Sequence, residues 1–66
     1  MKIICNGETR EAAEGMSVEE YIVSLDLDPE TVVVELDEVL VGRDEYREKI
    51  LRDGCRLEII RFVGGG

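Results

Sequence analysis

Apolar and polar positions at the start of the chain predict a β-hairpin. Residues 2–5 form a short, mainly apolar strand, and Asn6-Gly7 directly after it is a dipeptide that accepts the positive φ angles of a tight turn. Residues 8–13 return as a second strand, whose weak pattern indicates a place at or near a sheet edge. Gly15 ends this second strand.

The next apolar positions recur with the i, i+3, i+4, i+7 spacing of one helix face. They are Val18, Tyr21, Ile22 and Leu25. Ser17 and Glu20 fit the two positions of a capping box, in which each side chain accepts a backbone N–H. We predict a helix that begins after Ser17 and does not continue past Asp28, because Pro29 restricts the residue before it.

Valine-rich and alternating segments later in the chain predict three more strands. The first has a β-branched centre that suits a strand buried on at least one face, and Asp37-Glu38 and Asp53-Gly54 supply turns. Before the last strand lies a stretch without strong periodicity, where we expect an irregular or short helical crossover. The predicted segments are 31–36, 39–41, 43–51 (the crossover) and 56–63.

This order of elements predicts an α+β fold of the β-grasp (ubiquitin-like) type. One apolar helix stripe needs one apolar sheet face, and no second helix of similar strength exists to cover the other face. The crossover rule favours the first and last strands lying parallel at the centre of a mixed sheet of about five strands around one main helix. We therefore expect a single domain at residues 1–63 and a flexible glycine tail at 64–66.

The sheet face that the helix leaves uncovered is predicted to carry apolar side chains. In the last strand Leu57 and Ile59 share one face, whereas Ile60 and Phe62 share the other. Exposed apolar side chains on an open sheet are a candidate docking surface, although two of them also fall within ordinary surface composition. Ile60 and Phe62 are therefore candidate partner contacts.

Composition excludes several classes of function. A net charge of −8 argues against nucleic acid, whose phosphates require a basic face, and suits a basic protein partner, although acidity also simply keeps a small protein soluble. The 66 residues include no histidine, no phosphate-binding glycine motif and no metal-ligand spacing, so we do not expect an enzyme acting alone. With no apolar run long enough for a membrane and no leader, a cytoplasmic protein that is monomeric when free is the default expectation.

Cys5 and Cys55 are interpreted as small buried hydrophobic residues, because they form neither a C-x-x-C motif nor a metal-ligand spacing. If the first and last strands are parallel, Cys5 ends one strand and Cys55 begins the other. We expect a separation of more than about 10 Å, beyond the reach of a disulfide.

The chain finishes on Gly64-Gly65-Gly66. Without a Cβ atom these residues can thread a narrow slot, and three extended residues reach roughly 10 Å, which is enough to present a carboxylate to another protein's active site. The alternative is a mobile end without a role. The tail alone does not decide between the two.

Several short motifs identify a family through their order, spacing and total length. They are Asn6-Gly7-Glu8 after the opening strand, Ser17-Val18 at the helix start, Val41-x-Arg43 after the fourth strand, Asp53-Gly54, Leu57-Glu58-Ile59-Ile60, and Gly65-Gly66. Together they resemble the ThiS family of sulfur-carrier proteins of thiamin biosynthesis over the whole chain. The chain departs from the family at Gly42, where proline is frequent, and at Cys55, where a second acidic residue is frequent; Gly64 extends the usual glycine pair.

The resemblance implies a protein that partner enzymes modify, and not an enzyme. An adenylyltransferase of the ThiF kind would use ATP and Mg²⁺ to activate the carboxylate of Gly66, and a sulfur donor such as a cysteine desulfurase would convert it to a thiocarboxylate. The thiazole synthase ThiG would then take up the sulfur. Gly66 is the implied reactive site and Gly64 and Gly65 its tail; ATP and Mg²⁺ belong to the partner, so this chain itself is expected to bind no cofactor or metal.

Two alternatives remain open. Instead of a thiamin-type carrier, the chain could be a carrier of another pathway, such as the MoaD-like carrier of molybdopterin synthesis, or a non-covalent β-grasp interaction module with an inert tail. MoaD-like chains are longer, and the length of this chain therefore favours ThiS.

Overall fold

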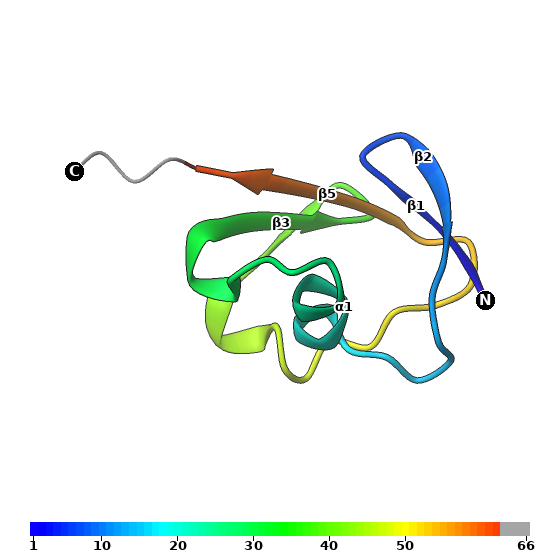
Figure 1. Ribbon diagram of the computed structural model, residues 1–66, viewed down its shortest axis with the longest axis horizontal. Helices are drawn as coiled ribbons and strands as arrows, with labels where there is room; N and C mark the ends of the chain where they lie inside the picture. The colour runs from blue at the N-terminus through cyan, green and yellow to red at the C-terminus, as the bar shows by residue number, and fades with distance from the viewer. Residues whose placement is uncertain (63–66) are drawn as a thin grey trace.

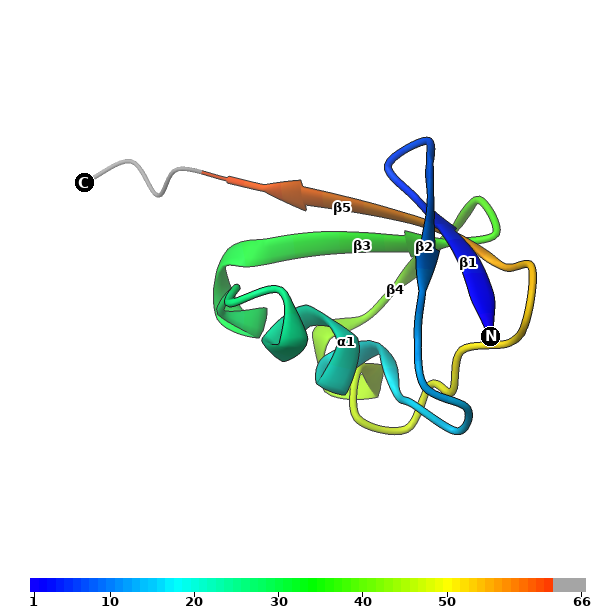
Figure 2. The same ribbon diagram turned by 45° about the vertical axis from the view of Figure 1, so that its right-hand side comes forward.

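The sheet has the β-grasp topology that the sequence predicts. The structure is a computed structural model and describes residues 1–62. The strands are β1 (Lys2–Cys5), β2 (Glu8–Glu11), β3 (Val32–Leu36), β4 (Val39–Val41) and β5 (Arg56–Arg61). They form one sheet in the order β2-β1-β5-β3-β4, in which β1 and β5 are parallel and the other pairs are antiparallel. The helix α1 (Val18–Ser24) lies against one face, and no element of residues 1–62 covers the opposite face (Figure 1, Figure 2).

The first hairpin closes on a turn with left-handed backbone angles. Asn6 and Gly7 have φ values of 51° and 80°, which asparagine and glycine adopt with little strain. β2 is exposed along its whole length and forms one edge of the sheet, as its weak pattern indicates. It ends at Glu11, two residues before the predicted end at Ala13, where the chain turns toward the helix.

The start of α1 agrees with the predicted capping box. The Ser17 hydroxyl accepts the Glu20 N–H at 3.1 Å, and the Glu20 carboxylate accepts the Ser17 N–H at 2.9 Å. Two backbone donors at the amino end of the helix are satisfied in this way. The capping box therefore sets where the apolar stripe of the helix begins.

The helix ends earlier than the sequence predicts. Its last residue is Ser24, and Asp26 takes a φ of 61° shortly after it. The amides of Asp26 and Leu27 donate back to helix carbonyls at 2.9 and 3.2 Å, which is the bonding pattern of a Schellman motif. Pro29 therefore does not end α1; it begins the separate 3₁₀ turn η1 (Pro29–Thr31). The stop is not evident from the sequence, because Asp26 occupies the position that glycine usually takes.

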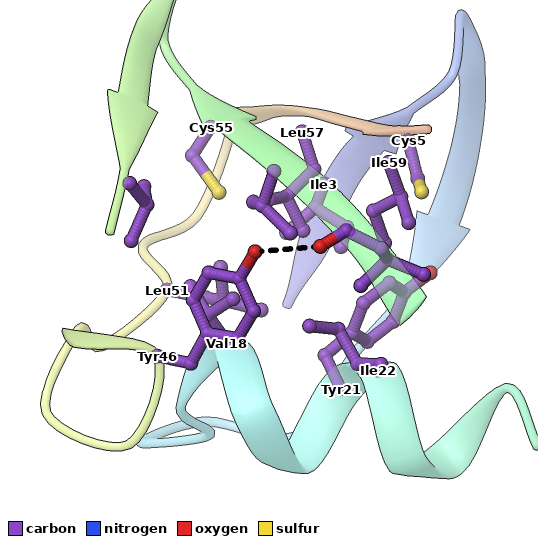
Figure 3. Close-up of a cluster of buried hydrophobic side chains, with 13 residues drawn as sticks. Ile3, Cys5, Val18, Tyr21, Ile22, Tyr46, Leu51, Cys55, Leu57 and Ile59 are labelled. Atoms are coloured by element: carbon purple, nitrogen blue, oxygen red, sulfur yellow. Dashed lines mark hydrogen bonds between the residues drawn. The ribbon is translucent and has the colours of Figure 1, made fainter. Parts of the chain in front are cut away.

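The hydrophobic core lies between α1 and the inner face of the sheet (Figure 3). The predicted helix stripe is confirmed, because its first three members are buried and Leu25 packs at the edge. The alternation in β5 is confirmed too, with Leu57 and Ile59 facing the core. The buried apolar side chains are Ile3, Cys5, Val18, Tyr21, Ile22, Val32, Val34, Val41, Tyr46, Leu51, Cys55, Leu57 and Ile59.

Two core residues come from the crossover, where the sequence shows no periodicity. Tyr46 follows the 3₁₀ turn η2 (Arg43–Glu45), and its hydroxyl donates to the buried Val32 carbonyl at 2.9 Å (Figure 3). Leu51 is buried beside it. Because single apolar residues in an irregular segment have no repeat to reveal them, sequence patterning did not identify either residue as core.

The two cysteines are free thiols, and both are buried. The β1–β5 register pairs Cys5 with Leu57, which places Cys55 two residues before the partner of Cys5. At ~3.3 Å per residue this offset is about 7 Å along the strands, shorter than the separation we expected. The offset and the spacing between strands together still keep the sulfurs from the geometry of a disulfide.

Candidate functional site

The predicted reactive residue Gly66 and the tail residues Gly64 and Gly65 lie outside the described residues. The structure therefore defines the base of the candidate site, where β5 ends at Arg61 and the chain continues to Phe62. The proposed role of the glycine tail stays a prediction. The structure can show how rigidly the chain is held just before the tail and which surface surrounds that point.

β5 is a central strand and is held from both sides. On one side it pairs in parallel with β1, and on the other it pairs with β3 along its whole length, from Leu36–Leu57 to Val32–Arg61. The ladder continues one residue beyond the strand, because the Phe62 N–H donates to the Thr31 carbonyl at 3.2 Å. The chain is therefore anchored to the sheet as far as the last described residue.

The uncovered sheet face carries an apolar cluster next to this point. Ile60 and Phe62 are 56% and 44% exposed, and Val33 lies directly opposite Ile60 on β3. The ladder bond of Phe62 continues the strand alternation, so its side chain follows that of Ile60 on the same face. We refer to Val33, Ile60 and Phe62 as the open-face patch. The predicted exposure of Ile60 and Phe62 is confirmed, whereas their role in docking stays a prediction.

Two carboxylates lie beside the open-face patch, and sequence reasoning missed their pairing. Glu35 and Glu58 are direct cross-strand partners on β3 and β5, two residues along the strand from Ile60 and therefore on the same face. Like charges at directly opposite positions destabilise a sheet. Neither carboxylate forms a salt bridge within residues 1–62. Only the strand register reveals the pair, since the two residues are far apart in the sequence.

The surface of the described residues has two further hollows. A groove of about 650 Å³ is lined by residues of the β3–β4 hairpin and the crossover, including the exposed Val39 and Ile50. A smaller hollow of about 270 Å³ includes Cys5 and Tyr21. Within residues 1–62, no group of three or more acidic, cysteine or histidine side chains is arranged to hold a metal ion. No helix in this part of the chain is both long and apolar enough to cross a membrane.

Cys5 and Tyr21 are the titratable groups with shifted pKa values. Burial raises the pKa of the Cys5 thiol above its ordinary value of 9.0, and the hydrogen bond with Tyr21 only partly opposes this. Burial also raises the pKa of the Tyr21 hydroxyl above 10.0, and the neighbouring Cys5 raises it further. A thiol with a raised pKa is a poor nucleophile at neutral pH, so the interpretation of Cys5 as a structural residue agrees with its surroundings.

These shifts predict that the protein becomes less stable in alkali. Both groups hold their protons more tightly in the folded state, so their contribution to stability is complete below about pH 9 and falls as the pH rises above it. Urea unfolding between pH 7 and pH 11 should show a decreasing free energy of unfolding. The variant Tyr21→Phe should flatten this decrease; an equally steep decrease in that variant would show that other groups cause it.

Comparison with known proteins gives one consistent family. The sequence model of the ThiS family matches residues 3–66. Among solved structures, the thiamine biosynthesis protein (ThiS) of Geobacter metallireducens matches with a TM-score of 0.85 and 30% sequence identity, over 100% of both chains. The sulfur carrier protein ThiS of Bacillus subtilis is 34% identical over 50 residues, which are 76% of each chain.

A second kind of relative is much longer. A thiazole synthase from Paramagnetospirillum magneticum is 38% identical over all 66 residues, but the match covers 20% of that protein. The chain therefore spans about a fifth of the length of the thiazole synthases that it matches. These proteins, which are named for thiazole synthesis, thus contain a segment similar to this chain within a longer polypeptide.

Proposed function

The chain belongs to the ThiS family, and from this membership we propose that it is a sulfur carrier of thiamin biosynthesis. The observation that carries the proposal is the match of the family to residues 3–66, because that range includes the glycine tail as well as the folded domain. In this function the chain is a co-substrate of partner enzymes. The reactive group is the carboxylate of Gly66.

The chemistry of a carboxylate explains why partner enzymes are needed. A carboxyl terminus is ionised at neutral pH and is a poor electrophile. We propose that a ThiF-like adenylyltransferase joins the Gly66 carboxylate to the α-phosphate of ATP, with Mg²⁺, and releases pyrophosphate. The terminal sulfur of a donor persulfide, such as that of a cysteine desulfurase, then attacks the acyl carbon and displaces AMP. A thiol reductant cleaves the S–S bond of the resulting acyl disulfide, which leaves a thiocarboxylate. ATP and Mg²⁺ are bound by the partner and not by this chain, and the proposed location of the reaction is the cytoplasm, where ATP is available.

The proposed acceptor of the sulfur is a ThiG-like thiazole synthase. The support comes from the thiazole synthases that contain a segment similar to this chain. A carrier and its acceptor in one polypeptide have a high effective concentration for each other, which suits a transfer between them. By analogy, this chain would bring its thiocarboxylate to a synthase of the same kind.

The open-face patch is the proposed docking surface for the adenylyltransferase. Ile60 and Phe62 are exposed and are among the last described residues before the tail. A partner that covers these two side chains is therefore in contact with the point where the tail begins. The Glu35–Glu58 pair beside the patch would be relieved by a basic side chain of the partner. Apolar contact and charge complementarity thus point to the same face of the sheet.

The intact mass of the protein tests the carrier function. Incubation with ATP, Mg²⁺, a ThiF-like adenylyltransferase and a sulfur donor should change the mass of the 66-residue chain by one oxygen-to-sulfur exchange. Omitting ATP should prevent the change, because the carboxylate is then not activated. An unchanged mass, with an adenylyltransferase shown to be active on another carrier, would contradict the proposal and favour a non-covalent module.

The variant Phe62→Asp tests the docking surface. A charge in place of a 44% exposed aromatic ring should weaken binding to the adenylyltransferase by about 30-fold, since apolar anchors at interface centres contribute about 2 kcal/mol each. Binding can be measured by titration calorimetry, and the urea midpoint of the variant should be nearly unchanged.

The matched control is Val23→Asp. Val23 is 55% exposed on α1, which lies on the covered side of the sheet. The variant Val23→Asp adds the same negative charge as Phe62→Asp, away from the proposed docking surface. It should bind the adenylyltransferase with unchanged affinity. If both variants weaken binding equally, the effect is one of net charge, and the open-face patch is not the docking surface.

A further inference from the structure

The side chain of Asn6 continues the hydrogen bonding between β1 and β5 after β1 has ended. Backbone bonds run from the Ile4 N–H to the Cys55 carbonyl at 2.9 Å and from the Asn6 N–H to the Leu57 carbonyl at 2.8 Å. The next residue of β5 in this alternating series is Ile59. Its N–H donates to the Asn6 Oδ1 at 2.8 Å, and its carbonyl accepts from the Asn6 Nδ2 at 3.2 Å. The amide therefore takes the place of a peptide group that the turn has removed.

The turn by itself does not require this amide. Asn6 has a φ of 51°, a conformation that aspartate and glycine also accept in tight hairpin turns. Only asparagine supplies both a donor and an acceptor from one planar group of the right length. Glycine would supply neither, and an ionised aspartate would place a second acceptor against the Ile59 carbonyl. The pair of bonds is therefore a contribution of Asn6 beyond its suitability for the turn.

The two bonds between Asn6 and Ile59 lie close to the carboxyl end of β5. On the β3 side the strand is bonded as far as Phe62. On the β1 side the backbone bonds end at Leu57, and the Asn6 amide extends them to Ile59. With the amide, the part of the strand that is held from the β3 side only begins after Ile59; without it, this part would begin directly after Leu57. Strand ends that are held from one side open locally at low free-energy cost.

We infer that Asn6 is a positioning residue for the carrier reaction, which fixes the direction in which the chain leaves the sheet toward Gly66. The inference rests on the proposed function. A tail that starts from a fixed strand end reaches a partner's active site in fewer orientations, and orientation contributes strongly to the rate of a reaction between bound groups. Asn6 acts through Ile59 and β5, and does not touch the reacting atoms.

Asn6→Gly is the direct test, because glycine keeps the turn and removes both side-chain bonds. With an adenylyltransferase that converts the wild-type chain, the variant should show a kcat/KM for ATP-dependent pyrophosphate release that is lower by about tenfold. Asn6→Asp should also be slower, since it keeps the turn and loses the donor. Amide hydrogen exchange should be faster at Phe62, although the bond from Phe62 to Thr31 is chemically unchanged.

A helix-cap variant separates positioning from a general loss of stability. Ser17→Ala removes the capping hydroxyl of α1, and its urea midpoint can be compared with that of Asn6→Gly. Ser17→Ala should keep the wild-type kcat/KM under conditions where both variants are folded. If Asn6→Gly matches Ser17→Ala in kcat/KM and in Phe62 exchange, the positioning role is overturned. A wild-type chain that is not adenylated would overturn the proposed function instead, and Phe62 exchange would still decide whether Asn6 holds the strand end.

Discussion

A chain that lacks Gly66 is expected to acquire no detectable sulfur from ATP, the adenylyltransferase and the sulfur donor. The shortened chain still ends in two glycines, so its carboxylate is as slender and as acidic as before. What changes is reach, because each extended residue spans about 3.3–3.6 Å. β5 is bonded to the sheet as far as Phe62, so a docked domain cannot release further strand residues to recover that length. Errors of about 1 Å in placing a reacting group can already cost 100-fold in rate.

The matched control for this deletion is Gly64→Ala. It keeps the length of the tail and the final pair of glycines, and adds one methyl group close to the folded domain. We expect it to be converted to the thiocarboxylate, as judged by intact mass. A loss of activity in Gly64→Ala would show that the slot rejects a side chain at this position, whereas normal activity of the shortened chain would contradict the importance of reach.

The strand order could be predicted because each local signal agreed with the others. The Asn6-Gly7 turn, the capping box at Ser17 and the alternation in β5 each define one element, and the crossover rule arranges these elements into one topology. The exposure of Ile60 follows from the same alternation. These features depend on residues that are close in sequence or repeat with a fixed period.

The features that the sequence did not reveal depend on contacts between distant residues. The end of α1 depends on Asp26 adopting a left-handed conformation that glycine usually takes. Tyr46 is buried by contacts with β3 and α1, and a crossover without periodicity gives no sign of them. The Glu35–Glu58 pair and the bonds of Asn6 to Ile59 need the register of β5 against its neighbours. The sequence thus identified the glycine tail and the open face of the sheet. The structure added the hydrogen bonds that hold β5, the strand that carries Ile60 on this face and leads to the tail.

Leu57→Ala should destabilise the domain by about 3 kcal/mol, the middle of the range for buried leucines. Leu57 is fully buried near the start of the central strand β5, where its neighbours across the sheet are Cys5 on β1 and Leu36 on β3. Three strands meet at this position, so the cavity cannot close by the movement of one edge. A domain of this size has little stability in reserve, and the Tm should fall by about 15 °C in calorimetry.

Leu40→Ala removes the same atoms from the edge strand β4 and is the control. Leu40 is 65% exposed, so its truncation creates no cavity and should change the free energy of unfolding by less than about 0.5 kcal/mol. Equal effects in the two variants would contradict the burial difference between them and would mean that β4 is covered in solution. If instead only Leu57→Ala is destabilised, the central strand that leads to the glycine tail is anchored by buried side chains as well as by its hydrogen bonds to β1 and β3.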